Sequence, residues 1–204
     1  MQPKVRHVEA HFDDRAAGYD TWYTRTIGAC ELVIVRKFLP TEGSILDYGA
    51  GSGRTTLDLL ERGLTVTAFD CSREMLAIAR RKAERGGHSA EFIEQQAELV
   101  GRTWPSITCI GVFDYYPDPR PLLNELRGYL SANGQLIATV PNAQSPLGWA
   151  YELGSRARLR IYPKHVAEFR KLAPDAGLKL AEVASAFPAL GMLGMTAVMR
   201  FEAR

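Results

Sequence analysis

A glycine-rich stretch between two apolar runs constrains this chain more than any other feature. Residues Ile45–Leu57 have the pattern of a buried strand, a glycine loop and a helix start, and a second apolar run, Val66–Phe69, ends at Asp70. Glycines at 49, 51 and 53 permit a tight turn and close approach of a ligand. The helix start offers unpaired N–H groups, and Asp70 is positioned to accept hydrogen bonds from ribose hydroxyls. The pattern predicts a nucleoside site at the carboxyl edge of a parallel sheet.

The loop departs from the fingerprint of dinucleotide-binding sites. That fingerprint is Gly-x-Gly-x-x-Gly, and Arg54 stands here where its third glycine would fall. Asp47, two residues before the first glycine, suits the cationic end of a ligand, such as the amino group of a methionine moiety, better than a pyrophosphate. A nucleotide-dependent oxidoreductase is kept as the alternative.

Composition and charge bound the class of protein. With 204 residues, 46% of them hydrophobic, 24% charged, and a net charge of +2, the chain is expected to form one domain. Cys30, Cys71 and Cys109 lack the spacing of a metal site or disulfide framework, which favours a reducing cytoplasm. No signal peptide or transmembrane segment is predicted, and neither a metal nor a nucleic-acid partner is expected. The oligomeric state is not predicted.

Strand and helix patterns alternate along the chain. Because such βα units form parallel sheets with right-handed crossovers, they predict a Rossmann-like doubly wound α/β fold. The last two apolar runs, 178–186 and 193–202, are joined too closely for a helix and predict an antiparallel hairpin. The fold class is therefore a seven-stranded, mostly parallel sheet with a C-terminal antiparallel hairpin. Helices are expected at 28–39, 53–62, 72–85 and 119–130, and the earlier strands at 44–48, 64–69, 90–94, 107–113 and 135–140.

Two motifs resemble those of the class I S-adenosylmethionine-dependent methyltransferases of small-molecule type. Asp47-Tyr-Gly-Ala-Gly-Ser-Gly53 resembles their first motif, and Phe69-Asp-Cys-Ser-Arg-Glu-Met-Leu76 their second. The resemblance implies S-adenosyl-L-methionine as cofactor and a single domain over 1–204, with an N-terminal lid at 1–30 and a substrate-cap insertion at 141–165. It assigns cofactor binding to Tyr19, Asp47, Gly49, Ala50, Gly51, Gly53, Asp70, Cys71, Met75, Gln96, Ala97, Ile110 and Gly111.

The resemblance also implies the reaction, which is transfer of a methyl group to a small-molecule acceptor by in-line displacement. Because the cofactor carries the activation, the protein mainly supplies position and electrostatics. Asp70 is expected on the ribose and Met75 near the adenine. Gln96 stands where the family more often has an aspartate, and offers a neutral amide to the adenine. A binding protein that keeps the cofactor without turnover remains a further possibility.

Candidates for a catalytic base are His11, Asp114 and Tyr115, with Tyr23 and His165 also considered. His11 directly precedes the segment Phe12–Asp20 of the predicted lid, and histidine titrates near neutral pH, although a solvated histidine on an N-terminal helix is the simpler interpretation. Asp114 and Tyr115 follow the fourth strand at the expected ligand edge, where they could instead cap the next helix. His165 is expected to start a helix.

The connection from residue 141 to 165 carries several basic and aromatic residues. A solvated helix whose arginines lie over apolar neighbours is the default interpretation. The functional interpretation is an arginine-lined mouth for an anionic or lipid-like acceptor. The residues concerned are Trp149, Tyr151, Arg156, Arg158, Arg160, Tyr162 and Lys164.

Overall fold

The fold is built on one mixed sheet. The computed structural model describes residues 9–14, 16–18, 22–155, 159–186 and 194–204. Within these ranges seven strands form a sheet in the order β3-β2-β1-β4-β5-β7-β6. The strands are β1 (Ser44–Tyr48), β2 (Thr65–Phe69), β3 (Glu91–Ile93), β4 (Trp104–Cys109), β5 (Leu130–Pro141), β6 (Leu178–Ser185) and β7 (Thr196–Ala203).

The strand directions confirm the predicted fold class. β3, β2, β1, β4 and β5 are parallel neighbours, whereas β7 runs antiparallel to both β5 and β6. The chain order reverses between β1 and β4, and ligands in open α/β sheets bind outside the carboxyl ends of the strands at such a point. The topology therefore places a ligand crevice where the glycine loop leaves β1.

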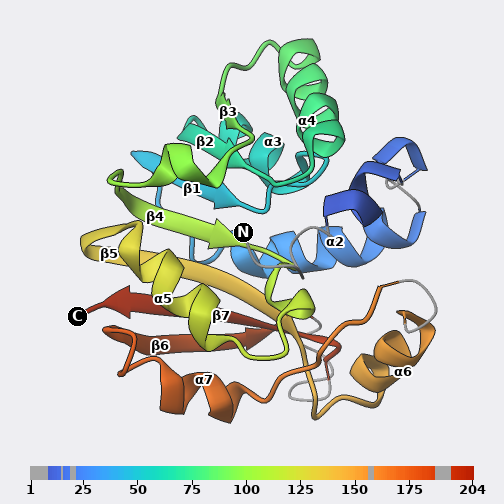
Figure 1. Cartoon of the computed structure of the whole chain (residues 1–204), viewed down its shortest axis with the longest axis vertical. Helices are drawn as coiled ribbons and strands as arrows, with labels where there is room; N and C mark the ends of the chain where they lie inside the picture. The colour runs from blue at the N-terminus through green and yellow to red at the C-terminus, as the bar shows by residue number, and fades with distance from the viewer. Residues whose placement is uncertain (1–8, 15, 19–21, 156–158, 187–193) are drawn as a thin grey trace.

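Helices cover both faces of the sheet (Figure 1). Three of them, α2, α3 and α4, lie on one face, and α5 and α7 cover the other, while α6 lies beyond the carboxyl end of β5. The helices are α2 (Trp22–Val35), α3 (Arg54–Glu61), α4 (Arg73–Arg85), α5 (Arg120–Gly128), α6 (Pro146–Ser155) and α7 (Val166–Leu172), with 3-10 turns η1 (Ala16–Gly18), η2 (Gln96–Leu99) and η3 (Phe113–Tyr115).

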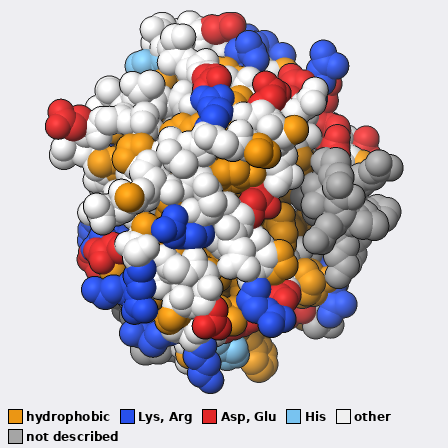
Figure 2. Space-filling view, turned by 60° about the vertical axis from the view of Figure 1, so that its left-hand side comes forward, with side chains coloured by type: hydrophobic (Ala, Val, Ile, Leu, Met, Phe, Trp, Pro, Cys, Tyr) orange, Lys and Arg blue, Asp and Glu red, His pale blue; other side chains and the backbone are white. Residues whose placement is uncertain are grey.

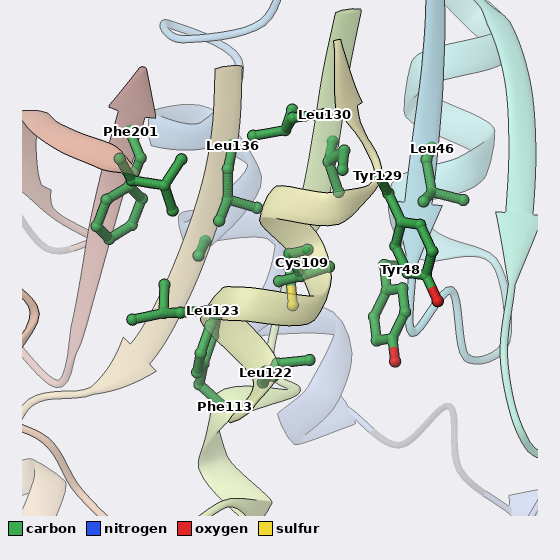
Figure 3. Packing of buried hydrophobic residues seen from close by; sticks show 14 of the residues in the cluster. Leu46, Tyr48, Cys109, Phe113, Leu122, Leu123, Tyr129, Leu130, Leu136 and Phe201 are labelled. Atoms are coloured by element: carbon green, nitrogen blue, oxygen red, sulfur yellow. The ribbon is translucent and has the colours of Figure 1, made fainter. Parts of the chain in front are cut away.

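Alternation along the strands sorts side chains between these two layers. In β1, Leu46 and Tyr48 belong to the large core cluster under α5, whereas Ile45 packs with α3 on the other face. Figure 3 shows Leu122 and Leu123 of α5 among the side chains of this large cluster. Asp47 shares the face of Ile45, so its carboxylate points toward α3 and must find partners inside the protein.

Three predicted boundaries were wrong. The strand predicted at 107–113 is β4, which starts at Trp104 and ends at Cys109, because Gly111 takes a positive φ of 73° and residues from Phe113 form a 3-10 turn. The helix predicted at 28–39 is α2, which begins at Trp22 and ends at Val35. The strand predicted at 135–140 is β5, which begins five residues earlier, at Leu130. The other predicted helices and strands are confirmed to within a few residues. Ser72, where the helix at 72–85 was predicted to begin, caps α4, and His165 precedes α7, as predicted.

The surface of the described residues carries both charge signs. On the face shown in Figure 2, Asp and Glu side chains lie among the Lys and Arg side chains, with apolar atoms between them. Each helix in the described part of the chain is too short or too polar to cross a lipid bilayer.

Gly53 offers a direct test of how the loop is packed. Its φ of 88° lies in the left-handed region, and an added Cβ would lie 2.8 Å from the Cβ and 2.9 Å from the Cα of Ala79 on α4. Gly63 has a similar φ of 81° with open space around it. Gly63→Ala should therefore lower the free energy of unfolding by roughly 1–2 kcal/mol, which is the left-handed penalty alone.

Gly53→Ala should lower that free energy by about 1–3 kcal/mol more, because α3 and α4 must also move apart. Urea unfolding of both variants measures the difference. Equal losses for the two variants would contradict the close packing of the loop against α4.

Candidate active site

The glycine loop is fixed by hydrogen bonds to the end of the neighbouring strand. The backbone N–H groups of Gly49 and Ala50 both donate to the carbonyl of Phe69, at 2.8 and 2.9 Å. From α4, Lys82 Nζ donates to the carbonyl of Ser52 at 2.9 Å. The loop conformation is therefore established by the protein itself.

Asp70 joins the two strand ends that flank the crevice. Its Oδ2 accepts the N–H of Gly51 at 2.8 Å, and its Oδ1 accepts the N–H of Ser72 at 2.8 Å. Burial raises the pKa of this carboxyl, and the two backbone donors oppose that effect. Each oxygen keeps a lone pair for a further donor, and Asp70 lines the cleft. Ribose hydroxyls are donors of this kind, so the geometry fits the predicted role.

Gly49 shows how closely the loop is approached by its neighbours. It has a φ of 78°, and a Cβ at this position would overlap the side chain of Val112, which follows β4. The loop after β1 and the segment after β4 therefore meet at the crevice with no space for a side chain between them. Gly49 of the loop and Val112 of the segment after β4 both line the cleft.

A cleft of about 1390 Å³ opens at this edge of the sheet. Pockets for one ligand commonly hold about 300–1,000 Å³, so this cleft has room for a nucleoside cofactor and a second molecule. Most predicted site residues line it together. They are Gly49, Ala50, Gly51, Asp70, Cys71, Met75, Gln96, Ala97, Ile110, Gly111, Asp114 and Tyr115.

The structure places three predicted site residues outside the cleft lining. Asp47 is 1% exposed, and its oxygens accept hydrogen bonds from Thr56 Oγ1 at 2.7 Å and Thr108 Oγ1 at 2.9 Å. Its partners explain this position, because they lie on α3 and β4. Burial raises its pKa to about 6. Gly53 packs against α4, and His11 contacts the ring of Phe12 edge-on. Tyr19 lies outside the described residues.

Arg54 holds a fixed position between α3 and α2, and this explains why no glycine is needed at residue 54. Its Nη2 lies 3.0 Å from Glu31 Oε2 of α2, and the guanidinium crosses α2 where Gly28 has no side chain. Both Arg54 and Glu31 line the cleft. The arginine that interrupts the dinucleotide fingerprint thus connects the helix after the glycine loop to α2.

Glu125 is a cleft residue that the sequence did not reveal. Its Oε1 accepts hydrogen bonds from Tyr48 Oη at 2.6 Å and from Gln96 Nε2 at 2.5 Å. It lines the cleft from α5, where the helical pattern alone suggests a solvent-facing charge. The amide of Gln96 is therefore oriented by a carboxylate that no local motif indicates.

Asp114 is the most unusual side chain in the cleft lining. It is 7% exposed, and its Oδ1 has no hydrogen-bond partner among the described residues. It does not cap α5. Asp118 does this instead, accepting the N–H of Arg120 at 3.0 Å.

The N-terminal segment closes over the same end of the cleft. Asp13 Oδ1 accepts a hydrogen bond from Ser72 Oγ at 2.5 Å, which ties residues 9–14 to the start of α4. The Phe12 ring packs edge-on against Tyr115 with centroids 5.5 Å apart, and both line the cleft.

Negative charge predominates in the cleft lining that the structure describes. The basic lining residues are Arg54 and Lys82. The acidic ones are Glu9, Glu31, Asp70, Glu94, Asp114, Asp118 and Glu125.

Comparison with known proteins identifies the same region. Residues 46–136 match the family model described as a methyltransferase domain. The ubiquinone biosynthesis O-methyltransferase of Actinobacillus pleuropneumoniae serotype 5b is 28% identical over 142 residues, covering 66% of this chain and 61% of that protein. That of Pseudomonas paraeruginosa is 25% identical over 154 residues, covering 69% and 66%. The chain thus spans about three fifths of the length of the first of these curated relatives.

Solved structures share the whole fold. A methyltransferase from Thermotoga maritima, described as a possible histamine N-methyltransferase, superposes with a TM-score of 0.79 at 21% identity, covering 97% of this chain and all of that one. Magnesium protoporphyrin IX methyltransferase from Synechocystis, with bound S-adenosylhomocysteine, gives 0.74 at 18% identity, covering 98% and 100%. The family match and these superpositions show that the chain is similar to methyltransferases and shares their fold.

Proposed function

We propose that this protein transfers a methyl group from S-adenosylmethionine to a small-molecule acceptor. The observation that carries the proposal is the carboxylate of Asp70, which holds the glycine loop and faces a cleft with room for two ligands. The relatives named O-methyltransferases support methyl transfer as the reaction.

The cleft lining offers groups for the ribose, the methionine part and the adenine of the cofactor. Asp70 would accept hydrogen bonds from the ribose hydroxyls. The backbone of Gly49 and Gly51 would lie alongside the methionine part, and Gln96 would contact the adenine. When bound, S-adenosylmethionine supplies a methyl group already activated on a sulfonium. The residues of this chain are left to bind, orient and exclude water, which accounts for much of the catalysis in such reactions.

The proposed lid and cap flank the second part of the cleft. Phe12, from the proposed lid at 1–30, lines it, and so do Pro141 and Tyr151 from the proposed cap at 141–165. Since these segments lie outside the sheet except for Pro141 at the end of β5, they would choose the acceptor while the sheet and its loops hold the cofactor.

An anionic acceptor finds little support in the described part of the cap. Arg160 lies over the Tyr162 ring at 5.1 Å, and Lys164 is 4% exposed, with its Nζ donating to the carbonyl of Tyr162 at 2.9 Å. Arg156 and Arg158 lie outside the described residues. A lipid-like partner is supported by exposed apolar side chains on α6, where Trp149 is 65% and Leu153 68% exposed.

The alternatives are less well supported. An oxidoreductase would need a pyrophosphate on the helix after the loop, where Arg54 and Glu31 now form an ion pair. A non-catalytic cofactor-binding protein would not need a buried carboxyl beside the second ligand space, as Asp114 provides. The free thiols of Cys30, Cys71 and Cys109 support a reducing compartment such as the cytoplasm.

We assign Asp114 and Tyr115 to the acceptor end of the cleft, with Asp114 as the proposed proton acceptor. Burial and the nearby charge of Glu31 raise the pKa of Asp114 to about 8, while Lys164 lowers it. A base that titrates near the working pH is the most effective kind. His11 contacts Phe12 rather than the cleft, and it is better placed to support the lid.

Cofactor binding tests the proposal directly. Isothermal titration calorimetry should show binding of S-adenosylmethionine and S-adenosylhomocysteine, and no binding of NAD. Asp70→Asn should weaken both by about 30-fold or more, because the amide loses the charge and presents a donor to the N–H of Gly51 or Ser72.

Glu91→Gln, on β3 and outside the cleft lining, is the control and should leave the affinity unchanged. Binding of NAD alone would overturn the proposal. Turnover of S-adenosylmethionine with a metabolite panel then separates an enzyme from a binding protein, since the latter would give no S-adenosylhomocysteine with any acceptor.

The pKa of Asp114 predicts how stability depends on pH. Between about pH 4 and pH 8 the native state keeps a proton on Asp114 that the unfolded chain has lost, so ionisation favours unfolding as the pH rises. Asp114→Asn removes this dependence. The free energy of unfolding of Asp114→Asn minus that of the wild type should therefore increase from pH 4 to pH 8. The increase should exceed about 1.4 kcal/mol, since a pKa shift of one unit has that value.

Urea unfolding at several pH values measures this difference. Glu91→Gln serves as the control, because the hydrogen bond from Arg102 lowers the pKa of Glu91 and confines its effect to acidic pH. A difference for Asp114→Asn that stays constant from pH 4 to pH 8 would show that Asp114 is ionised normally.

A further inference from the structure

The acceptor end of the cleft has an acidic character that the cofactor does not explain. Glu31, Asp114 and Asp118 line this end, and the one described basic residue in the lining there is Arg54, whose guanidinium is bound to Glu31. The ribose partner Asp70 and the adenine-side Glu125 are separate groups with their own hydrogen bonds. Asp118 is paired with Arg120 at 2.7 Å, so Asp114 is the acidic side chain of this end that has no charged partner in hydrogen-bond contact among the described residues.

The buried carboxyl of Asp114 is directed at a ligand. It is more than nine-tenths buried, lines the cleft, and has an Oδ1 without a hydrogen-bond partner in the described part of the chain. Leaving a buried polar atom unpaired destabilises a protein. Such an atom in a ligand cleft is expected to gain its partner when the ligand binds.

Lys164 does not supply that partner. Its Nζ donates to the carbonyl of Tyr162, and Lys164 does not line the cleft. Lys164 lowers the pKa of Asp114, but burial and the charge of Glu31 outweigh it. In the part of the chain that the structure describes, the basic residue of the lining at this end is Arg54, which is paired with Glu31.

An aromatic wall stands beside this carboxyl. The rings of Phe12 and Tyr115 pack edge-on at 5.5 Å, and both line the cleft. Because Tyr115 directly follows Asp114, the same turn, η3, carries the carboxyl and the Tyr115 ring of this wall. A cation is attracted both to a carboxylate and to aromatic faces.

We propose that the methyl acceptor carries a positively charged amine, which binds to Asp114 beside the aromatic pair Phe12–Tyr115, with Glu31 adding negative charge. This inference rests on the proposed methyltransferase function and narrows its acceptor to amine-bearing small molecules. It concerns recognition, so Asp114 acts here as a specificity-determining residue, whichever atom of the acceptor receives the methyl group.

The test compares matched ligands on the full chain saturated with S-adenosylhomocysteine. Three amine–carboxylate pairs are titrated by calorimetry, namely tyramine with 3-(4-hydroxyphenyl)propionate, benzylamine with benzoate, and hexylamine with hexanoate. Tyrosol serves as the neutral analogue of tyramine. At least one amine should bind, about tenfold or more tighter than its carboxylate, and tyramine should bind more tightly than tyrosol if it is that amine.

Substitutions test whether the preference for amines over carboxylates depends on Asp114. Asp114→Asn keeps the shape and should weaken the amine by about 30-fold or more, the effect of removing one partner of a buried charge pair. Glu31→Gln should weaken amine binding by a smaller factor than Asp114→Asn does. Asp175→Asn removes the same charge from an exposed turn before β6, at the opposite edge of the sheet, and should change nothing. Circular dichroism checks that each variant is folded.

The outcomes separate the two proposals. If S-adenosylhomocysteine does not bind, the proposed function fails. If it binds, but no amine does, or carboxylates bind as tightly as their amines, or Asp114→Asn keeps the amine affinity, the inference about the acceptor is overturned while the proposed function stands.

Discussion

The paired hydrogen bonds of Asp70 are the interaction on which the rest of the site depends. One carboxylate oxygen holds Gly51 of the loop after β1, and the other holds Ser72 at the start of α4. Ser72 in turn binds Asp13 of the N-terminal segment. A single buried carboxylate thus links the glycine loop, α4 and the proposed lid, and it does so at the strand end where a ribose would bind.

The burial of charge is tolerated here because most of it is paired. Asp47 receives two threonine hydroxyls, and Arg54 reaches Glu31 across Gly28. Asp114 is the exception, since its Oδ1 lacks a partner among the described residues. Unpaired buried groups concentrate where function requires them, and this one lies in the cleft, where the acceptor would complete it.

The sequence predicted the sheet and the loops that line the cleft well because their signals are local. Strand patterns, the three glycines and the cap at Ser72 each lie within a few residues of what they determine. The sequence predicted Asp47 beside a ligand, whereas the structure buries it against Thr56 and Thr108. The direction of its side chain depends on which face of β1 is covered by α3, and that is a tertiary property. Glu125 was missed for the same reason, since its hydrogen bonds come from Tyr48 and Gln96, far away in the chain.

A crystal structure of the complex with S-adenosylhomocysteine tests the central claim most directly. The ribose hydroxyls should lie within hydrogen-bond distance of Asp70, and the adenine should lie beside Gln96, with the glycine loop unchanged. A nucleoside bound elsewhere in the cleft, or bound without contact to the Asp70 carboxylate, would contradict the account.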